Sequence, residues 1–284
     1  MTYRQLCTML KDAKIEDAEW DALCLMEHFC AIPPTLLRAE PDRDYENTEL
    51  ESAIRRRLAH EPLQYILGEW EFYRQTFEVS PDCLIPRADT EILVETAIRL
   101  LPIGARFADL CTGSGCIAVS TLAERPDTQA IALEKFPKTL ALANRNAAKN
   151  GVAARFQGIL ADVLSPSLEL TKNAPFDAIL SNPPYIPTKD IATLSQEVHK
   201  EPLAALDGGA DGLIFYRAIL EQYSPLLKED GFFLFEIGFD QAEDLISLGN
   251  AHNFAHIRVI RDLGGHDRVI YLSNIPFDER SSTL

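Results

Sequence analysis

The stretch Phe176-Asp177-Ala178-Ile179-Leu180-Ser181-Asn182-Pro183-Pro184-Tyr185 decides the fold. Its first five residues are mostly apolar and form a run of the length expected for a buried strand. The two prolines stop that strand, because each lacks an N–H and fixes φ at about −65°. The stop leaves Asn182 rigid and exposed at the carboxyl end of the strand, the edge at which open α/β sheets bind ligands.

The residues after this strand suit a planar amide or aromatic amine. The side-chain carbonyl of Asn182 and the main-chain carbonyl of Pro183 are two acceptors for two N–H bonds, and the ring of Tyr185 can stack on the plane. Considered alone, the tetrapeptide is also compatible with a proline-rich turn that binds nothing. The rest of the chain has to decide between these interpretations.

Strand and helix patterns alternate from Arg106 onward, which predicts a doubly wound, mostly parallel sheet of Rossmann-like form. The expected strands cover 107–110, 129–133, 155–160, 176–180 and 232–237, with 257–260 and 268–271 as a closing antiparallel pair. A helix is expected from Asp89, as its N-cap, to Leu101. Further helices are expected up to Arg125, from Pro137 to Asn150-Gly151, and over 212–227.

Residues 1 to about 68 carry apolar side chains at helical spacing and predict a small helical bundle. Its last helix, 49–60, carries Arg55-Arg56-Arg57, which we interpret as a solvated face. Residues 69–79 alternate as in a β-hairpin, with the turn at Arg74-Gln75. The expected domains are therefore a helical docking domain (1–68), a hairpin linker (69–86) and a cofactor-binding domain (87–284).

Composition excludes several classes of protein. The chain has 284 residues, 46% of them hydrophobic, and a net charge of −16, so its surface repels nucleic acid as a whole. Its six cysteines form no C-x-x-C pair, which argues against a disulfide framework or a zinc site, and we expect no bound metal. Neither a signal pattern nor a membrane-spanning apolar run is present. We therefore expect a soluble, cytoplasmic protein.

A second motif, Asp109-Leu110-Cys111-Thr112-Gly113-Ser114-Gly115, lies between the first strand and its helix. Glycines there let the backbone approach a ligand closely, and the helix N-terminus offers N–H groups to a carboxylate. Glu134 ends the next strand at the spacing at which an acid meets ribose hydroxyls. This half of the sheet is therefore predicted to bind a nucleoside.

Two nucleoside cofactors compete for this motif. Residues 113–118 fit the dinucleotide pattern G-x-G-x-x-A, but Asp109 would crowd a pyrophosphate with negative charge. In S-adenosylmethionine the same acid would face the ammonium group, and Asp162 at the third strand end could accept from the adenine amine. Each acid taken singly is compatible with a surface or capping role. Three acids at successive strand ends beside a glycine turn favour a site.

With both motifs on one sheet, the chain resembles the class I S-adenosylmethionine-dependent methyltransferases of amino groups. It resembles one branch in particular, the peptide chain release factor glutamine N5-methyltransferases. The resemblance covers most of residues 60–272, and the first 60 residues match mainly as a small helical domain. Its further marks are Glu61-Pro62-Leu63-Gln64-Tyr65-Ile66-Leu67-Gly68, Phe72-Tyr73, Leu84-Ile85-Pro86-Arg87, Asp89-Thr90-Glu91, Glu201-Pro202, Ala204-Ala205-Leu206, Arg261-Asp262-Leu263 and Asp267-Arg268.

The resemblance implies residue roles. Contacts to S-adenosylmethionine are expected at Asp109, Cys111, Thr112, Gly113, Ser114, Gly115, Glu134, Asp162, Val163 and Asn182. The substrate amide is expected at Asn182, Pro183, Pro184 and Tyr185, with Arg87 and Thr90 lining the same pocket. Two positions depart from some relatives: Val163 replaces an aromatic residue over the adenine, and Glu134 replaces an aspartate.

The implied activity is methylation of the side-chain amide nitrogen of the glutamine in the Gly-Gly-Gln motif of class I release factors. The partner is then a protein, gripped by the N-terminal bundle and by residues 186–211, and the enzyme acts as a monomer without touching nucleic acid directly. Three alternatives stay open. They are a ribosomal-protein glutamine methyltransferase, an adenine-N6 methyltransferase of nucleic acid, and a nicotinamide oxidoreductase or non-catalytic cofactor-binding module.

Overall fold

The computed structural model describes residues 1–277, which form two compact units. The first contains Met1–Glu69 and Leu194–Glu201, and the second contains Trp70–Thr193 and residues 202–277. This division differs from the expected domains in two ways. The hairpin, except for its first residue Glu69, belongs to the second unit instead of forming a separate linker. Residues 194–201, which we call the strap, group with the N-terminal bundle although they are distant from it in sequence.

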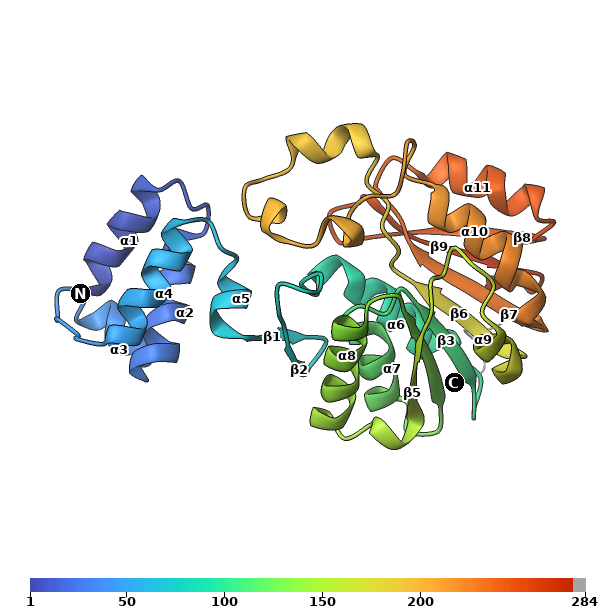
Figure 1. The fold of residues 1–284 in the computed structure, drawn as a ribbon, viewed down its shortest axis with the longest axis horizontal. Helices are drawn as coiled ribbons and strands as arrows, with labels where there is room; N and C mark the ends of the chain where they lie inside the picture. Colours follow the sequence, from blue (N-terminus) through green and yellow to red (C-terminus); the bar gives the residue numbers. More distant parts are fainter. Residues whose placement is uncertain (278–284) are drawn as a thin grey trace. The chain divides into compact units, whose positions relative to one another are not determined.

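Residues 1–69 of the first unit form the predicted helical bundle, drawn in blue to cyan in Figure 1. Two of its helices begin at strong caps: the Thr2 side chain accepts from the Gln5 N–H, and Asn47 accepts from the N–H groups of Glu49 and Leu50. Leu6, Leu10, Leu25, Met26 and Leu50 are fully buried between the helices. The helices are α1 (Tyr3–Asp12), α2 (Ala18–Cys30), α3 (Pro34–Ala39), α4 (Thr48–Leu58) and α5 (Leu63–Leu67).

The predicted solvated face of Arg55 to Arg57 is wrong for Arg57, which is only 3% exposed. Its guanidinium donates to Asp21 Oδ2 at 2.6 Å, to Glu197 Oε1 at 2.5 Å and to the carbonyl oxygen of Glu61 at 3.1 Å. A buried charge needs such partners, because leaving it unpaired costs several kcal/mol, roughly 3–5 in measured cases. Since Glu197 lies in the strap, Arg57 attaches this segment to the bundle.

The second unit contains the predicted seven-stranded sheet. Its strand order is β5-β4-β3-β6-β7-β9-β8, and β9 runs antiparallel to both of its neighbours, while the other pairings are parallel. The predicted closing antiparallel pair is confirmed. The strands are β3 (Arg106–Leu110), β4 (Gln129–Glu134), β5 (Phe156–Leu160), β6 (Phe176–Ser181), β7 (Leu227–Glu236), β8 (His256–Arg261) and β9 (Asp267–Ser273).

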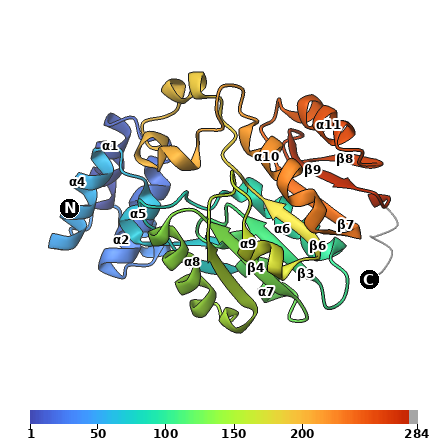
Figure 2. The same cartoon turned by 45° about the vertical axis from the view of Figure 1, so that its right-hand side comes forward.

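Two helical layers cover the sheet (Figure 2). Residues of α6, α7 and α8 pack with one face, and residues of α9, α10 and α11 pack with the other. Successive residues of β6 feed both cores: Ala178 and Leu180 join the first, and Phe176 and Ile179 the second. This explains why β6 is mostly apolar and does not alternate between apolar and polar residues. The helices are α6 (Glu91–Leu100), α7 (Cys116–Glu124), α8 (Pro137–Lys149), α9 (Leu168–Asn173), α10 (Ile214–Tyr223) and α11 (Ala242–Ala251).

Two local predictions need correction. The hairpin strands are β1 (Glu69–Phe72) and β2 (Gln75–Glu78), so the turn is Tyr73-Arg74 and not Arg74-Gln75. Both turn residues have positive φ, 44° and 70°, as a two-residue hairpin loop requires. The predicted N-cap at Asp89 is also wrong. A 3-10 turn, Ala88–Thr90, precedes α6, and Thr90 takes the cap position without a capping hydrogen bond from its side chain.

Candidate active site

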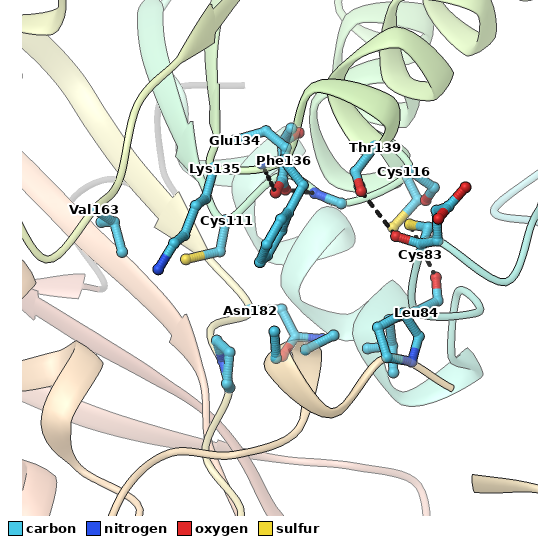
Figure 3. A pocket seen from close by; sticks show the side chains of 18 of the residues that line it. Cys83, Leu84, Cys111, Cys116, Glu134, Lys135, Phe136, Thr139, Val163 and Asn182 are labelled. Carbon is cyan, nitrogen blue, oxygen red and sulfur yellow. Dashed lines mark hydrogen bonds between the residues drawn. The ribbon is translucent and has the colours of Figure 1, made fainter. Parts of the chain in front are cut away.

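The carboxyl ends of β3, β4, β5 and β6 open onto a cavity of about 530 Å³ that lies entirely within the second unit (Figure 3). Small-molecule sites are of this order, about 300–1,000 Å³. The cavity collects most of the residues selected from the sequence. Those lining it are Arg87, Thr90, Cys111, Thr112, Gly113, Ser114, Glu134, Asp162, Val163, Asn182 and Pro184, together with segments 82–86 and 202–207 except Leu206.

The glycine turn adopts the backbone conformation for which its glycines were selected. Gly113 and Gly115 have φ of 57° and 82°, and a Cβ on Gly115 would lie 3.3 Å from the Cβ of Ala143. Cys111 also has a positive φ, 59°, which costs energy for a residue with a side chain. No residue pattern around Cys111 indicates this strain. Positive φ at these positions turns the chain back sharply beneath the cavity.

Asp109 lies under this turn, fully buried, and within residues 1–277 it is not one of the side chains that line the cavity. Its Oδ2 accepts from the Thr112 hydroxyl at 2.6 Å and from the Ala118 N–H at 3.2 Å. Burial raises the pKa of Asp109 to about 7, although both hydrogen bonds oppose the rise. The observed contacts of Asp109 therefore hold the turn against the start of α7, and its contact to a cofactor ammonium stays a prediction.

Glu134 faces the cavity from the end of β4, and its carboxylate accepts from two backbone groups. Oε2 accepts from the Gly113 N–H at 3.1 Å and Oε1 from the Phe136 N–H at 3.0 Å. A carboxylate offers about four lone-pair sites, so two stay available to a pair of hydroxyls. Burial raises the pKa of Glu134. The placement suits the predicted contact to a ribose.

The end of β5 carries Asp162, whose carboxylate forms an ion pair with Lys135 Nζ at 2.9 Å. Partial burial alone would raise the pKa of Asp162, but this pair and the Leu164 N–H outweigh it, and the pKa is lowered. Figure 3 shows Lys135 and Phe136 extending from the end of β4 into the cavity, with Val163 nearby. Phe136, to which no sequence motif pointed, supplies the aromatic surface that is absent at Val163.

Asn146 is a second residue that the sequence analysis missed. It lies fully buried on α8, where its Oδ1 accepts from the Glu78 N–H at 2.7 Å. Its Nδ2 donates to the carbonyl oxygens of Glu78, at 3.1 Å, and Ser114, at 2.9 Å. One side chain thus ties strand β2 of the hairpin to the glycine turn.

Asn182 ends the predicted strand and donates from Nδ2 to the Thr90 hydroxyl oxygen at 3.1 Å. That hydroxyl donates to Glu236 Oε2 at 2.6 Å. With Nδ2 engaged, Oδ1 of Asn182 is the group that a substrate amide can use. Figure 3 shows Asn182 at the cavity, across from the residues of β4.

Pro183 and Tyr185 do not line the cavity, whereas Asn182 and Pro184, among the described residues, do. The Tyr185 hydroxyl lies 3.3 Å from Glu236 Oε1, and its carbonyl oxygen accepts from Gln241 Nε2 at 3.0 Å. A Cβ on Gly212 would lie 2.3 Å from the same carbonyl oxygen, so only glycine fits there. The stacking role of Tyr185 and the acceptor role of Pro183 stay predictions.

The arrangement fits a nucleoside with an amino-acid tail, as in S-adenosylmethionine. A strained glycine turn, a carboxylate with free lone pairs and a second carboxylate follow each other at three neighbouring strand ends. Within residues 1–277, His, Cys, Asp and Glu side chains form no group of three that could hold a metal ion. Over the same range, no helix is both long enough and apolar enough to cross a bilayer.

Comparison with known proteins gives matches along most of the chain. Two family models match, the PrmC N-terminal domain over residues 2–68 and the methyltransferase small domain over residues 88–229. The release factor glutamine methyltransferase of Geobacter sulfurreducens is 38% identical over 266 residues, which is 92% of this chain and 91% of that protein. The protein of the same name from Cereibacter sphaeroides is 40% identical over 265 residues, 92% of this chain and 93% of its own length.

Among solved structures, the catalytic domain of hMettl16 in complex with the MAT2A 3'UTR hairpin 6 has a similar fold. It aligns with a TM-score of 0.59 over 80% of this chain and 82% of that one, at 13% sequence identity. An identity this low supports the shared fold and nothing about what is bound. The fold match agrees with the strand order described above.

Proposed function

The chain belongs to the family of release factor glutamine methyltransferases, and from that premise we propose that it methylates a glutamine in class I peptide chain release factors. The methyl donor is S-adenosylmethionine, and the acceptor is the side-chain nitrogen, N5, of the glutamine in the Gly-Gly-Gln motif. The enzyme acts as a monomer in the cytoplasm, where its protein partner works, and makes no direct contact with nucleic acid.

One observation carries this proposal: the amide of Asn182 is held by its nitrogen, so its oxygen is available at the cavity. A glutamine amide is a poor nucleophile, because its nitrogen lone pair is delocalised into the carbonyl. Two acceptors, Asn182 Oδ1 and the Pro183 carbonyl oxygen, would hold its two N–H bonds and aim the nitrogen. Positioning of this kind contributes to rate, and so does the stabilisation of charge that develops on nitrogen.

The cofactor half of the cavity is assigned in the same way. Bound S-adenosylmethionine supplies an electrophilic sulfonium methyl group. Glu134 would accept from the ribose hydroxyls and Asp162 from the adenine amine, with Val163 and Phe136 beside the ring. The methionine part would lie on the turn made of Cys111, Thr112, Gly113, Ser114 and Gly115, with Asp109 beneath it.

In the proposed transfer, the nitrogen–methyl bond forms as the methyl–sulfur bond breaks, and sulfur keeps the electron pair of that bond. The acceptors on Asn182 and Pro183 stabilise the positive charge while it grows on nitrogen. One N–H proton then leaves the methylated nitrogen for solvent. Because the proton leaves after the methyl transfer, this order of steps needs no strong base in the cavity.

The test is mass spectrometry of a class I release factor incubated with the full chain and methyl-labelled S-adenosylmethionine. We expect one added methyl group on the peptide that contains Gly-Gly-Gln, and none on a release factor whose glutamine is replaced by leucine. Label on a ribosomal protein from a cell extract, with none on the release factor, would favour the ribosomal-protein alternative. Label on adenine, with transfer falling steeply as salt is added, would favour the nucleic-acid alternative.

A further inference from the structure

Resting on the proposed function, we further propose that Thr90 and Glu236 are positioning residues that fix which end of the Asn182 amide meets the substrate. They make Asn182 an acceptor at the cavity. The site thereby selects a glutamine amide, which donates two N–H bonds, over a glutamate carboxylate, which donates none.

The three residues come from three separate elements and form one chain of hydrogen bonds. Asn182 follows β6, Thr90 precedes α6, and Glu236 ends β7. The two links measure 3.1 Å from Asn182 Nδ2 to Thr90 Oγ1 and 2.6 Å from Thr90 Oγ1 to Glu236 Oε2. Thr90 and Glu236 are each only 1% exposed, so water has little access to the link between them.

The number of protons available fixes which group donates in each of these hydrogen bonds. The Thr90 hydroxyl has a single proton, and an ionised Glu236 can only accept it. The Thr90 oxygen is then left as an acceptor toward Asn182, so the Asn182 group that faces it must be the NH₂. The carboxylate thus sets the orientation of an amide that it does not touch.

Protonation of Glu236 would remove this constraint. A protonated carboxyl can donate to Thr90, whose own proton is then free to point at Asn182 and bind Oδ1. The amide would turn over and present NH₂ to the cavity, where it opposes the N–H bonds of a glutamine. The same turned amide would suit a carboxylate, because a carboxylate accepts.

The surroundings of Glu236 favour this titration near neutral pH. Burial raises the pKa of Glu236 to about 7, and the Thr90 hydrogen bond and the positive charge of Arg268 pull it down, while Asp89 pushes it up. The Tyr185 hydroxyl faces the same carboxylate. Cys116 and Tyr216 are further titratable groups beside it, and the Tyr216 hydroxyl donates to the Glu236 carbonyl oxygen at 2.7 Å.

The first experiment removes the Thr90 hydroxyl, which interrupts the hydrogen bonds between Asn182 and Glu236, and measures selectivity for glutamine over glutamate. Release factors carrying glutamine or glutamate at the target position compete for the enzyme bound to S-adenosylhomocysteine. We expect Thr90→Val, which keeps the shape and loses the hydroxyl, to reduce the preference for glutamine about tenfold or more, the order of one charge-assisted hydrogen bond. Its kcat should fall by a similar factor without a matching rise in KM, and Thr90→Ser should restore most of the loss.

A matched control is available in Thr121, whose buried hydroxyl has no hydrogen-bond partner among the described residues. Thr121→Val makes the same chemical change on α7, outside the chain of hydrogen bonds. We expect its preference for glutamine to equal that of the unaltered chain. Melting temperature and affinity for S-adenosylhomocysteine, measured for every variant, separate loss of folding from loss of orientation.

The second experiment replaces the carboxyl group of Glu236, which titrates, by an amide, which does not. The rate of the unaltered enzyme should fall as pH drops through about 7, where the carboxyl of Glu236 takes up its proton, and approach a tenfold loss per unit below it. In Glu236→Gln this acid limb should disappear, whatever the rate at the plateau, because the amide does not titrate. An acid limb that persists in Glu236→Gln, or a Thr90→Val variant with unchanged preference, would overturn the positioning role.

These outcomes are separable from failure of the proposed function. If the unaltered chain methylates no release factor, the proposed function is wrong. If it methylates glutamine, and the Thr90 and Glu236 variants keep both selectivity and pH profile, only the positioning role is wrong.

Discussion

Asp109 and Glu236 lie at the same edge of the sheet, both buried, and burial raises the pKa of each to about 7. Their partners differ. Asp109 accepts from Thr112 and Ala118, which follow it by three and nine positions in the sequence. Glu236 accepts from Thr90, which is 146 positions away in the sequence.

The difference separates the two halves of the cavity. On the β3–β4 side, carboxylates hold backbone N–H groups and so fix the path of the chain around a cofactor. On the β6–β7 side, a carboxylate acts through a hydroxyl to fix one side chain that faces the substrate. We therefore expect changes on the first side to affect cofactor affinity and stability, and changes on the second to affect rate and selectivity.

The sharpest test of this division is Asn182→Ala. We expect kcat to fall on the order of 10²-fold or more, by analogy with removal of one preorganised donor in an oxyanion hole. The affinity for S-adenosylhomocysteine, measured by calorimetry, should barely change, because the β3–β4 side is untouched. Asn144→Ala, on the exposed surface of α8, is the matched control and should keep the full rate. A normal rate in Asn182→Ala would refute the amide clamp.

Asp109→Asn tests the other buried carboxylate through stability. Because the folded pKa of Asp109, about 7, exceeds its ordinary value of 3.8, the folded state holds the proton between these values while the unfolded state releases it. The free energy of unfolding should therefore decrease with rising pH across that window, by at most about 1.4 kcal/mol per unit for this one proton. Denaturant titrations at several pH values should show a shallower slope in the variant.

The same variant separates two roles of Asp109. Its acid limb of kcat should match that of the unaltered enzyme, in contrast to Glu236→Gln. A tenfold or greater loss of affinity for S-adenosylhomocysteine would support the predicted contact between Asp109 and the cofactor ammonium. An affinity within a few-fold would assign the carboxylate to the turn alone.

Asn146→Ala tests how the hairpin supports the cofactor side. The change leaves the Glu78 N–H and the carbonyl oxygens of Glu78 and Ser114 without their partner. Buried groups left in this way cost about 1–3 kcal/mol each, and we expect a loss of about 2–4 kcal/mol in the free energy of unfolding after relaxation. Chemical denaturation measures it. A loss below 0.5 kcal/mol, about the effect of a neutral surface change, would contradict the assignment.

Gly115→Ala tests the left-handed backbone of the turn. Both the positive φ and the contact with Ala143 oppose a Cβ, so we expect a loss of stability of about 1–3 kcal/mol, together with weaker cofactor binding. Gly104→Ala carries a similar φ of 72°, but has nothing within 4 Å of the added Cβ. It should lose stability and retain cofactor affinity. Equal affinity losses in both would show that backbone strain alone, and not the place of Gly115 in the turn next to the cavity, matters.

The smallest effect is expected for Lys135→Met. Half-exposed ion pairs contribute about 0.2–1 kcal/mol, so releasing Asp162 from Lys135 should tighten binding of S-adenosylhomocysteine by about two- to fivefold. The apolar part of the side chain is kept. Lys11→Met, which removes the exposed pair with Glu19 in the first unit, is the control and should leave the affinity unchanged. Weaker binding in Lys135→Met would show that the ammonium contacts the cofactor.

The sequence predicted the sheet because the signals for it are local. Each central strand is a short, mostly apolar run that ends at an acid or is followed within three residues by Pro, Gly or an acid, so the strands and their order along the chain could be recognised. The start of β7 was missed. Lys228-Glu229-Asp230 looks like a loop, although Leu227 already pairs with Phe176 across a register shift.

The cavity was predicted in part, for the same reason. Glu134 ends β4 and Asn182 directly follows β6, and their position at one edge follows from the parallel order of the strands. Asn146 and Glu236 gave no such signal, because their partners lie far away in sequence and only folding brings them together. Arg57 was misread for that reason too: an arginine in a basic run looks solvated until Asp21 and Glu197 are placed beside it.

The strap has a consequence for anyone building hybrids from members of this family. Because residues 194–201 group with the bundle while the chain on either side belongs to the second unit, the bundle is encoded in two pieces. If only the first 69 residues came from another member of the family, Glu197 would face that member's residue at position 57 instead of Arg57. The buried guanidinium of Arg57 or the partly exposed carboxylate of Glu197 would then lack its counter-charge. Shuffling should therefore move both pieces together, and a hybrid that does so should melt higher than one that moves the first piece alone.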